Sequence, residues 1–331
     1  MKNKLAFLLV AVVLLLAACG TGSNNGSSTG TEDKETSQDT KKYKIGVTQI
    51  VEHPSLDAAY KGFQAAFADA GIEAEFIYQT ANGDNNANMS IAQKLVGDQV
   101  DLIFANSTPS AQAAKSATSD IPIVFTSVTD AIDAQLIHSM EEPGGNVTGT
   151  IDLHPDTIAN TVAFMKNELG AKKVGTVYNS GEQNSVAQIA QVKQALANEG
   201  LELVEASVAT SAEVKQATES LVGKVDALYI VTDNTVVSAL ESVIDVAKVN
   251  SLPTMVGELD SVARGGLGAY GFEYYDIGYE AGQMAIQILQ DGKSPSEVPA
   301  AYPANLKLVI NKSVADALGL EIKDTWNAEV K

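Results

Sequence analysis

Residues 44–47 (KIGV) form the first of a series of short apolar runs, and residues 173–178 (KVGTVY) begin the series again. Each run is rich in branched aliphatic residues and precedes a longer segment of helical period, an order typical of β-α-β units with a parallel sheet. The runs are residues 44–47, 74–78, 101–105 and 121–125, then residues 173–178, 201–204, 226–230 and 252–256. Helices are predicted between the first four runs, at about 55–70, 85–98 and 108–118.

Landmark residues keep a nearly constant separation between the two series. Gly175 lies 129 residues after Gly46, and Pro253 lies 131 residues after Pro122. A separation this steady indicates two copies of one unit. The predicted fold class is α/β, with two similar doubly wound parallel-sheet domains joined by hinge strands. Because ligands of open α/β sheets bind beyond the carboxyl ends of the strands, two facing domains create one site between them.

Two glycine-rich segments mark where the chain is expected to cross between the domains. The first, Glu141–Asp152, contains a turn and then an extended run; the second, Gly265–Gly271, precedes a helix-forming segment at about 276–290. Such crossings are natural hinges, because a few residues absorb the dihedral changes of domain closure. The predicted N-terminal lobe is residues 43–150 with about 272–295, and the C-terminal lobe is residues 151–265 with about 300–331.

The N-terminal segment indicates export and lipid anchoring. Residues 1–18 have the order of a signal peptide, since Lys2 and Lys4 precede a run of apolar residues that is too short to span a bilayer. Cys19 follows two alanines, an order that resembles the bacterial lipoprotein signal, in which the cysteine carries the lipid. Residues 19–42 are predicted to be the lipidated cysteine and a flexible tether, because they hold no aromatic or branched aliphatic residue. The alternative is an ordinary secretory cleavage site with an incidental cysteine.

Composition excludes several classes of function. Against 41 acidic residues the chain has 22 Lys and Arg, and the resulting net charge of −19 repels nucleic-acid phosphates. With a single cysteine, neither an intramolecular disulfide nor a thiolate cluster for a metal can form. The three histidines have no metal-ligand spacing, and neither a phosphate-binding loop motif nor a Gly-x-Ser-x-Gly elbow occurs. We therefore expect no metal, no cofactor, no nucleic acid and no catalysis.

Short motifs along the chain point to one family. They are GVTQIVEHPSLD at residues 46–57, IPIVF at 121–125, VTD at 128–130, PGGNVTG at 143–149, VYN at 177–179, EQNS at 182–185, DN at 233–234 and YYDIG at 274–278. Over about residues 43–320 the chain resembles the ABC-transporter substrate-binding lipoproteins related to tryptophan- and tyrosine-binding proteins. The resemblance implies a type I periplasmic-binding-protein fold, no catalysis, and delivery of a small solute to an ABC permease and its ATPase. It also implies an aromatic amino acid as the solute.

The first domain offers polar residues at the ends of its predicted strands. The segment 106–112 opens a helix with small polar residues, and a helix N-terminus with free N–H groups binds a carboxylate well. The alternative is that Ser107 or Thr108 is only an N-cap, and that the others are turn formers. The candidate ligand-binding residues of this domain are Thr48, Gln49, Ser107, Thr108, Thr126, Ser127 and Asp130.

The second domain offers an anion for the ammonium group of an amino acid. Asp233, at a strand end, is the first choice and Glu258 the second, although Asp233 is equally placed to be the N-cap of a helix at about 234–248. Aromatic walls for a ring are sought among Tyr178, Phe125, Tyr270 and Phe272. The candidate ligand-binding residues of this domain are Tyr178, Asn179, Glu182, Asn184, Ser185, Asp233, Asn234 and Glu258.

The sequence thus predicts a solute-binding lipoprotein of an ABC importer, held on the extracellular or periplasmic face of the cell membrane. Its two lobes would close on one small molecule, and we expect a monomer. Two alternatives stay open. One is a sensory receptor component that binds the ligand but passes on a signal, and the other is a secreted hydrolase that uses Asp233 and Glu258 as paired carboxylates.

Overall fold

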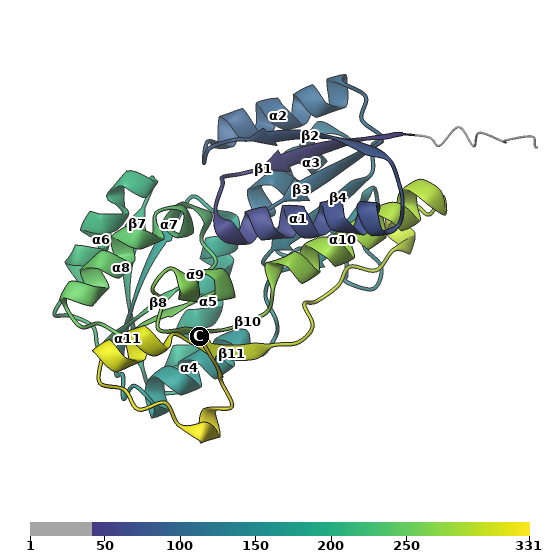
Figure 1. The fold of residues 1–331 in the computed structure, drawn as a ribbon. Helices are drawn as coiled ribbons and strands as arrows, with labels where there is room; N and C mark the ends of the chain where they lie inside the picture. Colours follow the sequence, from purple (N-terminus) through teal and green to yellow (C-terminus); the bar gives the residue numbers. More distant parts are fainter. Residues whose placement is uncertain (1–41) are drawn as a thin grey trace, which may run out of the picture. The chain divides into compact units, whose positions relative to one another are not determined.

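The computed structural model describes residues 42–331 (Figure 1). The predicted signal peptide, the lipid site Cys19 and all of the tether but its last residue therefore lie outside the described residues. Within residues 42–331, no helix combines the length and the apolar character needed to cross a membrane.

The first sheet has five strands, all parallel, in the order β2-β1-β3-β4-β5. The strands are β1 Tyr43–Gln49, β2 Ala74–Thr80, β3 Leu102–Asn106, β4 Ile123–Val128 and β5 Val147–Ile151. The helices between them are α1 Pro54–Asp69, α2 Asn85–Gly97 and α3 Thr108–Ala117. The strand order reverses between β1 and β3, and at such a point an open α/β sheet places its ligand crevice at the carboxyl ends of the strands.

The second sheet has seven strands, and its first four repeat the order of the first sheet as β7-β6-β8-β9. The strands are β6 Lys173–Asn179, β7 Glu202–Val208, β8 Ala227–Ile230, β9 Thr254–Val256, β10 Gly268–Gly271, β11 Lys307–Ile310 and β12 Glu329–Val330. The predicted fold class of two similar doubly wound domains is confirmed. One pair departs from it, since β10 and β11 are antiparallel.

Seven helices of the described chain belong to this second sheet. They are α4 Thr157–Asn167, α5 Gln183–Asn198, α6 Val214–Leu221, α7 Asn234–Ser238, α8 Leu240–Val249, α9 Leu259–Ala263 and α11 Lys312–Ala317. Short 3-10 turns occur at η1 Ser211–Glu213, η2 Pro295–Glu297 and η3 Asp324–Trp326. The single helix predicted at about 234–248 is divided between α7 and α8, because Ala239 has φ −119° and ψ 28°, which is not helical.

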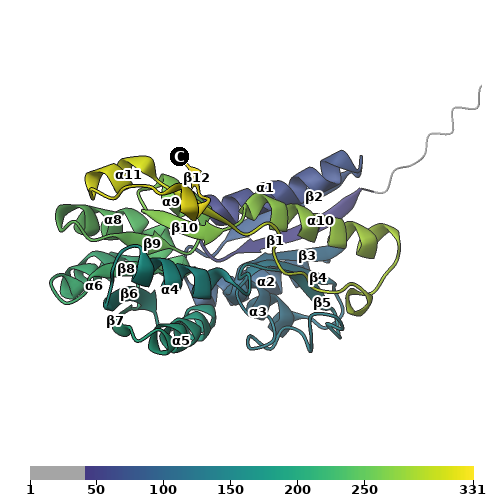
Figure 2. The same cartoon turned by 90° about the horizontal axis from the view of Figure 1, so that it is seen from below.

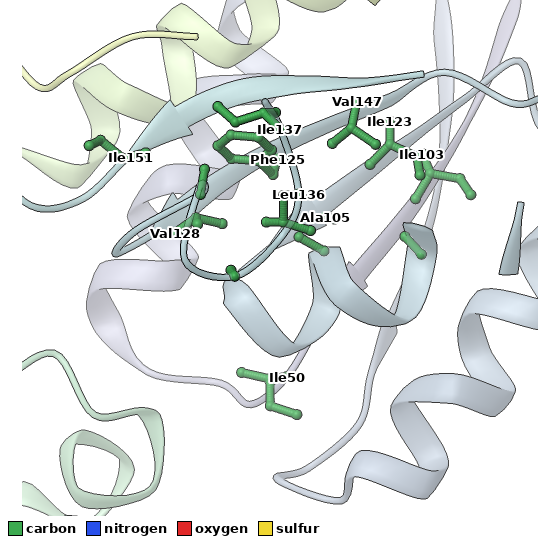
Figure 3. Close-up of a cluster of buried hydrophobic side chains, with 14 of the residues drawn as sticks. Ile50, Ile103, Ala105, Ile123, Phe125, Val128, Leu136, Ile137, Val147 and Ile151 are labelled. Atoms are coloured by element: carbon green, nitrogen blue, oxygen red, sulfur yellow. The ribbon is translucent and has the colours of Figure 1, made fainter. Parts of the chain in front are cut away.

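Each face of the first sheet is covered by a separate apolar core. On the face of α2 and α3 the cluster includes Phe125, Leu136 and Ile137 (Figure 3). On the face of α1, Phe63 and Phe104 stack with ring centroids 3.8 Å apart. Burial of a side chain of this size contributes about 1.5–3 kcal/mol to folding. The two cores therefore stabilise the sheet whose strand ends carry the candidate site.

Helix α10 Tyr274–Gln290 follows the second sheet in sequence but packs on the first. It lies along α1 in both views (Figures 1 and 2) and also contacts β4 and β5. The two helices approach so closely that a Cβ atom added to Gly278 would lie 1.9 Å from the carbonyl oxygen of Ala59. We refer to the first sheet with α1–α3 and α10 as the first lobe, and to the second sheet with its seven helices as the second lobe.

Candidate functional site

The two lobes meet at the carboxyl ends of their strands, where the buried polar side chains gather. Thr129, after β4, and Thr232, after β8, have their hydroxyl oxygens 3.4 Å apart. The side-chain amide of Gln183 on α5 donates to the carboxylate of Asp133, and α9 contacts α1. Each lobe thus contributes polar groups to one interior zone, as a site for a small solute requires.

In the first lobe, two neighbouring strand ends hold strained residues. Ser107, after β3, has φ 111°, and Ser127, at an irregularity in the pairing of β4 with β5, has φ 56°. A positive φ in a non-glycine residue costs free energy and persists where the surrounding structure fixes it, often at a binding site. The hydroxyl oxygens of Ser127 and Thr108 are buried without a hydrogen-bond partner among the described residues. These groups are available to a ligand at the N-terminus of α3.

Other predicted residues of the first lobe have their bonds within the protein. Thr48 donates to Asn88 Oδ1 at 3.1 Å. Gln49 donates to the carboxylate of Asp57 at 2.9 Å and accepts from Asn106 Nδ2 at 2.9 Å. These bonds tie β1 to α1, α2 and β3, so the two residues shape the crevice.

The remaining first-lobe candidates are similarly engaged. Thr126 and Thr150 have their hydroxyl oxygens 2.8 Å apart, which links β4 to β5. Ser107 Oγ accepts from the backbone N–H of Ser110 at 3.4 Å, which is the N-cap contact of α3. Asp130 Oδ1 accepts two backbone N–H groups of its own loop.

Asp233 is fully buried, and both of its carboxylate oxygens are engaged. Oδ1 accepts from the backbone N–H of Val236 at 2.8 Å, the N-cap bond of α7. Oδ2 accepts from the backbone N–H of Asn179 and from Ser185 Oγ, both at 2.6 Å. This geometry favours the N-cap interpretation of Asp233 over the ammonium role.

Glu182 makes a second bond network beside Asp233. One carboxylate oxygen accepts from the backbone N–H and hydroxyl of Thr235, at 2.9 and 2.6 Å, and the other accepts from Asn234 Nδ2 at 2.7 Å. Asn184 donates to the carbonyl of Thr232 at 3.3 Å, but its Oδ1 is buried without a partner among the described residues. Asn184 therefore adds a free acceptor, whereas Glu182 holds the start of α7.

The aromatic candidates divide between core and site. Tyr178 packs against the second-lobe core and its hydroxyl donates to Glu205 at 3.1 Å. Tyr270 packs edge-on to Phe164 in the same core, and Phe125 lies in the first-lobe core. Phe272 stacks on Tyr274 with ring centroids 5.7 Å apart, at the crossing between lobes. Of these four rings, Phe272 is the one placed next to the acidic cluster described below.

Asp152 and Tyr274 join two of the chain crossings, and the sequence did not single them out as site residues. Tyr274, at the start of α10, donates its hydroxyl to Asp152 Oδ2 at 2.7 Å. Glu258 lies close enough for its charge to act on both. The sequence did hold a signal for Asp152, because an acidic residue directly follows the extended run 147–151 at the end of a predicted strand. We define Asp152, Glu258 and Tyr274 as the hinge cluster.

Burial controls the ionisation of the hinge cluster. Burial raises the pKa of Asp152 to about 6, an effect that the Tyr274 and Thr129 hydroxyls partly offset. Burial raises the pKa of Glu258 to about 7, and it raises the pKa of Asp233 to about 7 together with the charge of the neighbouring Glu182. The protein without ligand therefore holds carboxyl groups that resist losing their protons.

These shifts predict how stability depends on pH. A carboxyl group whose pKa is higher in the folded state binds more protons there, so its contribution to stability falls as the pH rises from about 4.5 to about 7. For Glu258 we expect a loss of about 2–3 kcal/mol, measured by urea unfolding of the ligand-free protein between pH 4.5 and 8. Glu258→Gln, which cannot ionise, should show a smaller loss; an equal loss would contradict the assignment.

Comparisons with known proteins identify the family and the fold. The family model described as ABC transporter substrate binding protein matches residues 44–330. The tyrosine-binding protein of Clostridioides difficile (strain R20291) is 42% identical over 326 residues, which cover 97% of this chain and 93% of that protein. Solved sugar- and polyol-binding proteins at 16% and 14% identity, with TM-scores of 0.60 and 0.61, share the fold alone.

Two solved structures are similar to this chain in different degrees. An ABC domain from Streptococcus pneumoniae in complex with L-Trp is 32% identical, with a TM-score of 0.83 over 88% of this chain and 100% of that one. The ligand-free, open structure of CD0873 from Clostridium difficile, a substrate-binding protein with adhesive properties, is 40% identical, with a TM-score of 0.65 over 87% and 99%. The structure with the lower sequence identity is thus the better structural match.

Proposed function

The chain belongs to the family of ABC transporter substrate-binding proteins, and from this premise we propose that it captures an aromatic amino acid between its two lobes for import. Family membership confirms the family predicted from the motifs. It also makes the protein a binding protein rather than an enzyme, which removes the hydrolase alternative.

One observation carries the proposal: free, buried hydrogen-bonding atoms gather where the lobes meet. Thr108 Oγ1, Ser127 Oγ and Asn184 Oδ1 have no partner among the described residues, although a buried polar atom without a partner costs about 1–3 kcal/mol. A bound solute with polar groups removes that cost. The N-terminus of α3 between Ser107 and Thr108 suits the carboxylate of an amino acid.

Two similar proteins support the proposal that the solute has an aromatic side chain. The tyrosine-binding protein is similar over nearly the whole chain, and the well-matched structure from Streptococcus pneumoniae holds L-Trp. The lobes here match that complex better than the open, ligand-free structure, which supports a closed arrangement of the lobes. In this arrangement Phe272 offers one ring face near the hinge cluster.

The setting of the protein is also part of the proposal. We infer that Cys19 carries a lipid that anchors the chain outside the cytoplasm, that residues 20–42 tether the lobes, and that the closed form docks on an ABC permease with its ATPase. Each lobe would move as one unit when the protein closes. The first lobe comprises residues 43–150 and about 272–295, and the second lobe comprises residues 151–265 and about 300–331.

Ligand binding can be measured by thermal unfolding. A ligand at 100 times its Kd stabilises the folded state by about 2.7 kcal/mol, so we expect tryptophan, tyrosine or phenylalanine to raise the Tm by about 5 °C or more. Leucine and glucose serve as controls. No shift with any aromatic amino acid at millimolar concentration would reject the proposal, and ligand recovered chemically unchanged would support transport.

A further inference from the structure

We propose that Asp152 and Glu258 together bind the ammonium group of the amino acid, and that Tyr274 positions Asp152 for this role. The inference rests on the proposed function and assigns one part of its site. It replaces Asp233, the first choice from the sequence, with two carboxylates from the hinge cluster.

The first argument is charge without a counterion. Asp152 is 5% exposed and Glu258 is 2% exposed. Neither makes an ion pair with Lys, Arg or His anywhere in residues 42–331. Arg264 acts weakly on Glu258, but its guanidinium is bound to Glu241 at 2.8 and 2.7 Å. Two buried carboxylates near each other require a cation from outside the chain to be stable when ionised.

The second argument is unused hydrogen-bonding capacity. Asp152 Oδ2 accepts from Tyr274, whereas Oδ1 is buried and has no partner at hydrogen-bond distance in the described part of the chain. Glu258 Oε1 accepts from Ser261 Oγ at 2.7 Å, which orients the side chain at the start of α9. An ammonium group has three N–H donors and needs several acceptors around it. Asp233 lacks this capacity, because both of its oxygens are already bonded.

The third argument is the position of Asp152 relative to the carboxylate site. The backbone N–H of Asp152 donates to the carbonyl of Val128 at 2.9 Å, and Val128 directly follows Ser127. The free hydroxyl of Ser127 and the free oxygen of Asp152 therefore come from paired segments of adjacent strands. The ammonium and carboxylate groups of an α-amino acid are joined through one carbon atom, so they need acceptors and donors on neighbouring segments of this kind.

The arrangement sets the specificity of the site. A ligand with the same ring and carboxylate but no amine leaves the hinge cluster without its cation. We therefore expect the protein to bind tryptophan far more tightly than indole-3-propionate. The groups that face the two carboxylates also include Tyr274 and Asp260, and neither supplies a positive charge.

The test compares the two ligands in variants of the full chain by isothermal titration calorimetry. Asp152→Asn keeps an acceptor for Tyr274, and Glu258→Gln keeps one for Ser261. Each should weaken tryptophan binding about 30-fold or more, because a charge partner in a buried site is lost, and change indole-3-propionate binding by less than about 3-fold. Asp245→Asn, an exposed carboxyl on α8 that belongs to no candidate set, should leave both affinities unchanged.

The outcomes separate the inference from the proposed function. Tryptophan binding by the unaltered protein with both variants within about 3-fold of it would overturn the inference alone. Equal weakening of both ligands would also overturn it, since a merely structural role affects each. Failure of the unaltered protein to bind any aromatic amino acid would reject the proposed function and the inference with it. If Asp152→Asn does not fold, Glu258→Gln decides the question.

Discussion

Gly278→Ala is expected to lower the free energy of unfolding by about 3 kcal/mol, a value at the upper end for overpacking. The added methyl group would lie 1.9 Å from the backbone oxygen of Ala59, and a backbone atom in a packed helix cannot move aside as a flexible side chain can. Helix α10 would separate from α1, and the first lobe would lose part of its cover. Urea unfolding followed by circular dichroism measures the effect.

Gly97 provides a matched control for this prediction. It also lies in a helix, at the end of α2, but no atom is within 4 Å of a Cβ added to it. Gly97→Ala should leave the stability unchanged or raise it by up to about 1 kcal/mol, since alanine is the better helix former. If Gly278→Ala behaved like Gly97→Ala, the close packing of α10 on α1 would be wrong.

Asp233→Ala is expected to destabilise the protein by about 4 kcal/mol. Three donors lose their acceptor at once, namely the buried N–H group of Val236, the buried hydroxyl of Ser185 and the partly buried N–H group of Asn179. Each buried unsatisfied group costs about 1–3 kcal/mol, and relief of the repulsion from Glu182 returns a part. The unfolding free energy of the ligand-free protein at pH 7 measures the loss.

Asp84 offers the same residue in the same role at the surface. Asp84 is the exposed N-cap of α2 and accepts from two backbone N–H groups of its first turn. Because water can replace these bonds, Asp84→Ala should cost only about 1 kcal/mol. Similar losses in the two variants would show that burial adds nothing at Asp233.

The alternation of apolar runs and helical segments was enough to predict the two sheets. The repeated offsets between Gly46 and Gly175 are reproduced as the equivalent strands β1 and β6, because strand pattern and turn chemistry are local properties of the sequence. The antiparallel β11 could not be predicted in this way. Its direction depends on the chain returning from α10 in the other lobe, which is a tertiary fact.

The sequence predicted the region of the site better than it predicted the role of each residue there. Polar residues at strand ends do gather where the lobes meet, but the sequence cannot show which oxygens are already bonded. Asp233 and Asp152 illustrate the difference, because both are buried acids and only the structure shows that one has a free oxygen. Tyr274 was part of a quoted motif, yet its bond to Asp152 spans 122 residues of sequence.

The return of α10 to the first lobe, and of β11 to the second, has a consequence for biosynthesis. A ribosome that has made the first 150 residues has not yet made the helix that covers one face of their sheet, and the second sheet awaits residues 307–310. Neither half can finish folding before nearly the whole polypeptide has emerged. Both lobes thus reach their native packing late in synthesis, after the residues of β11 have been made.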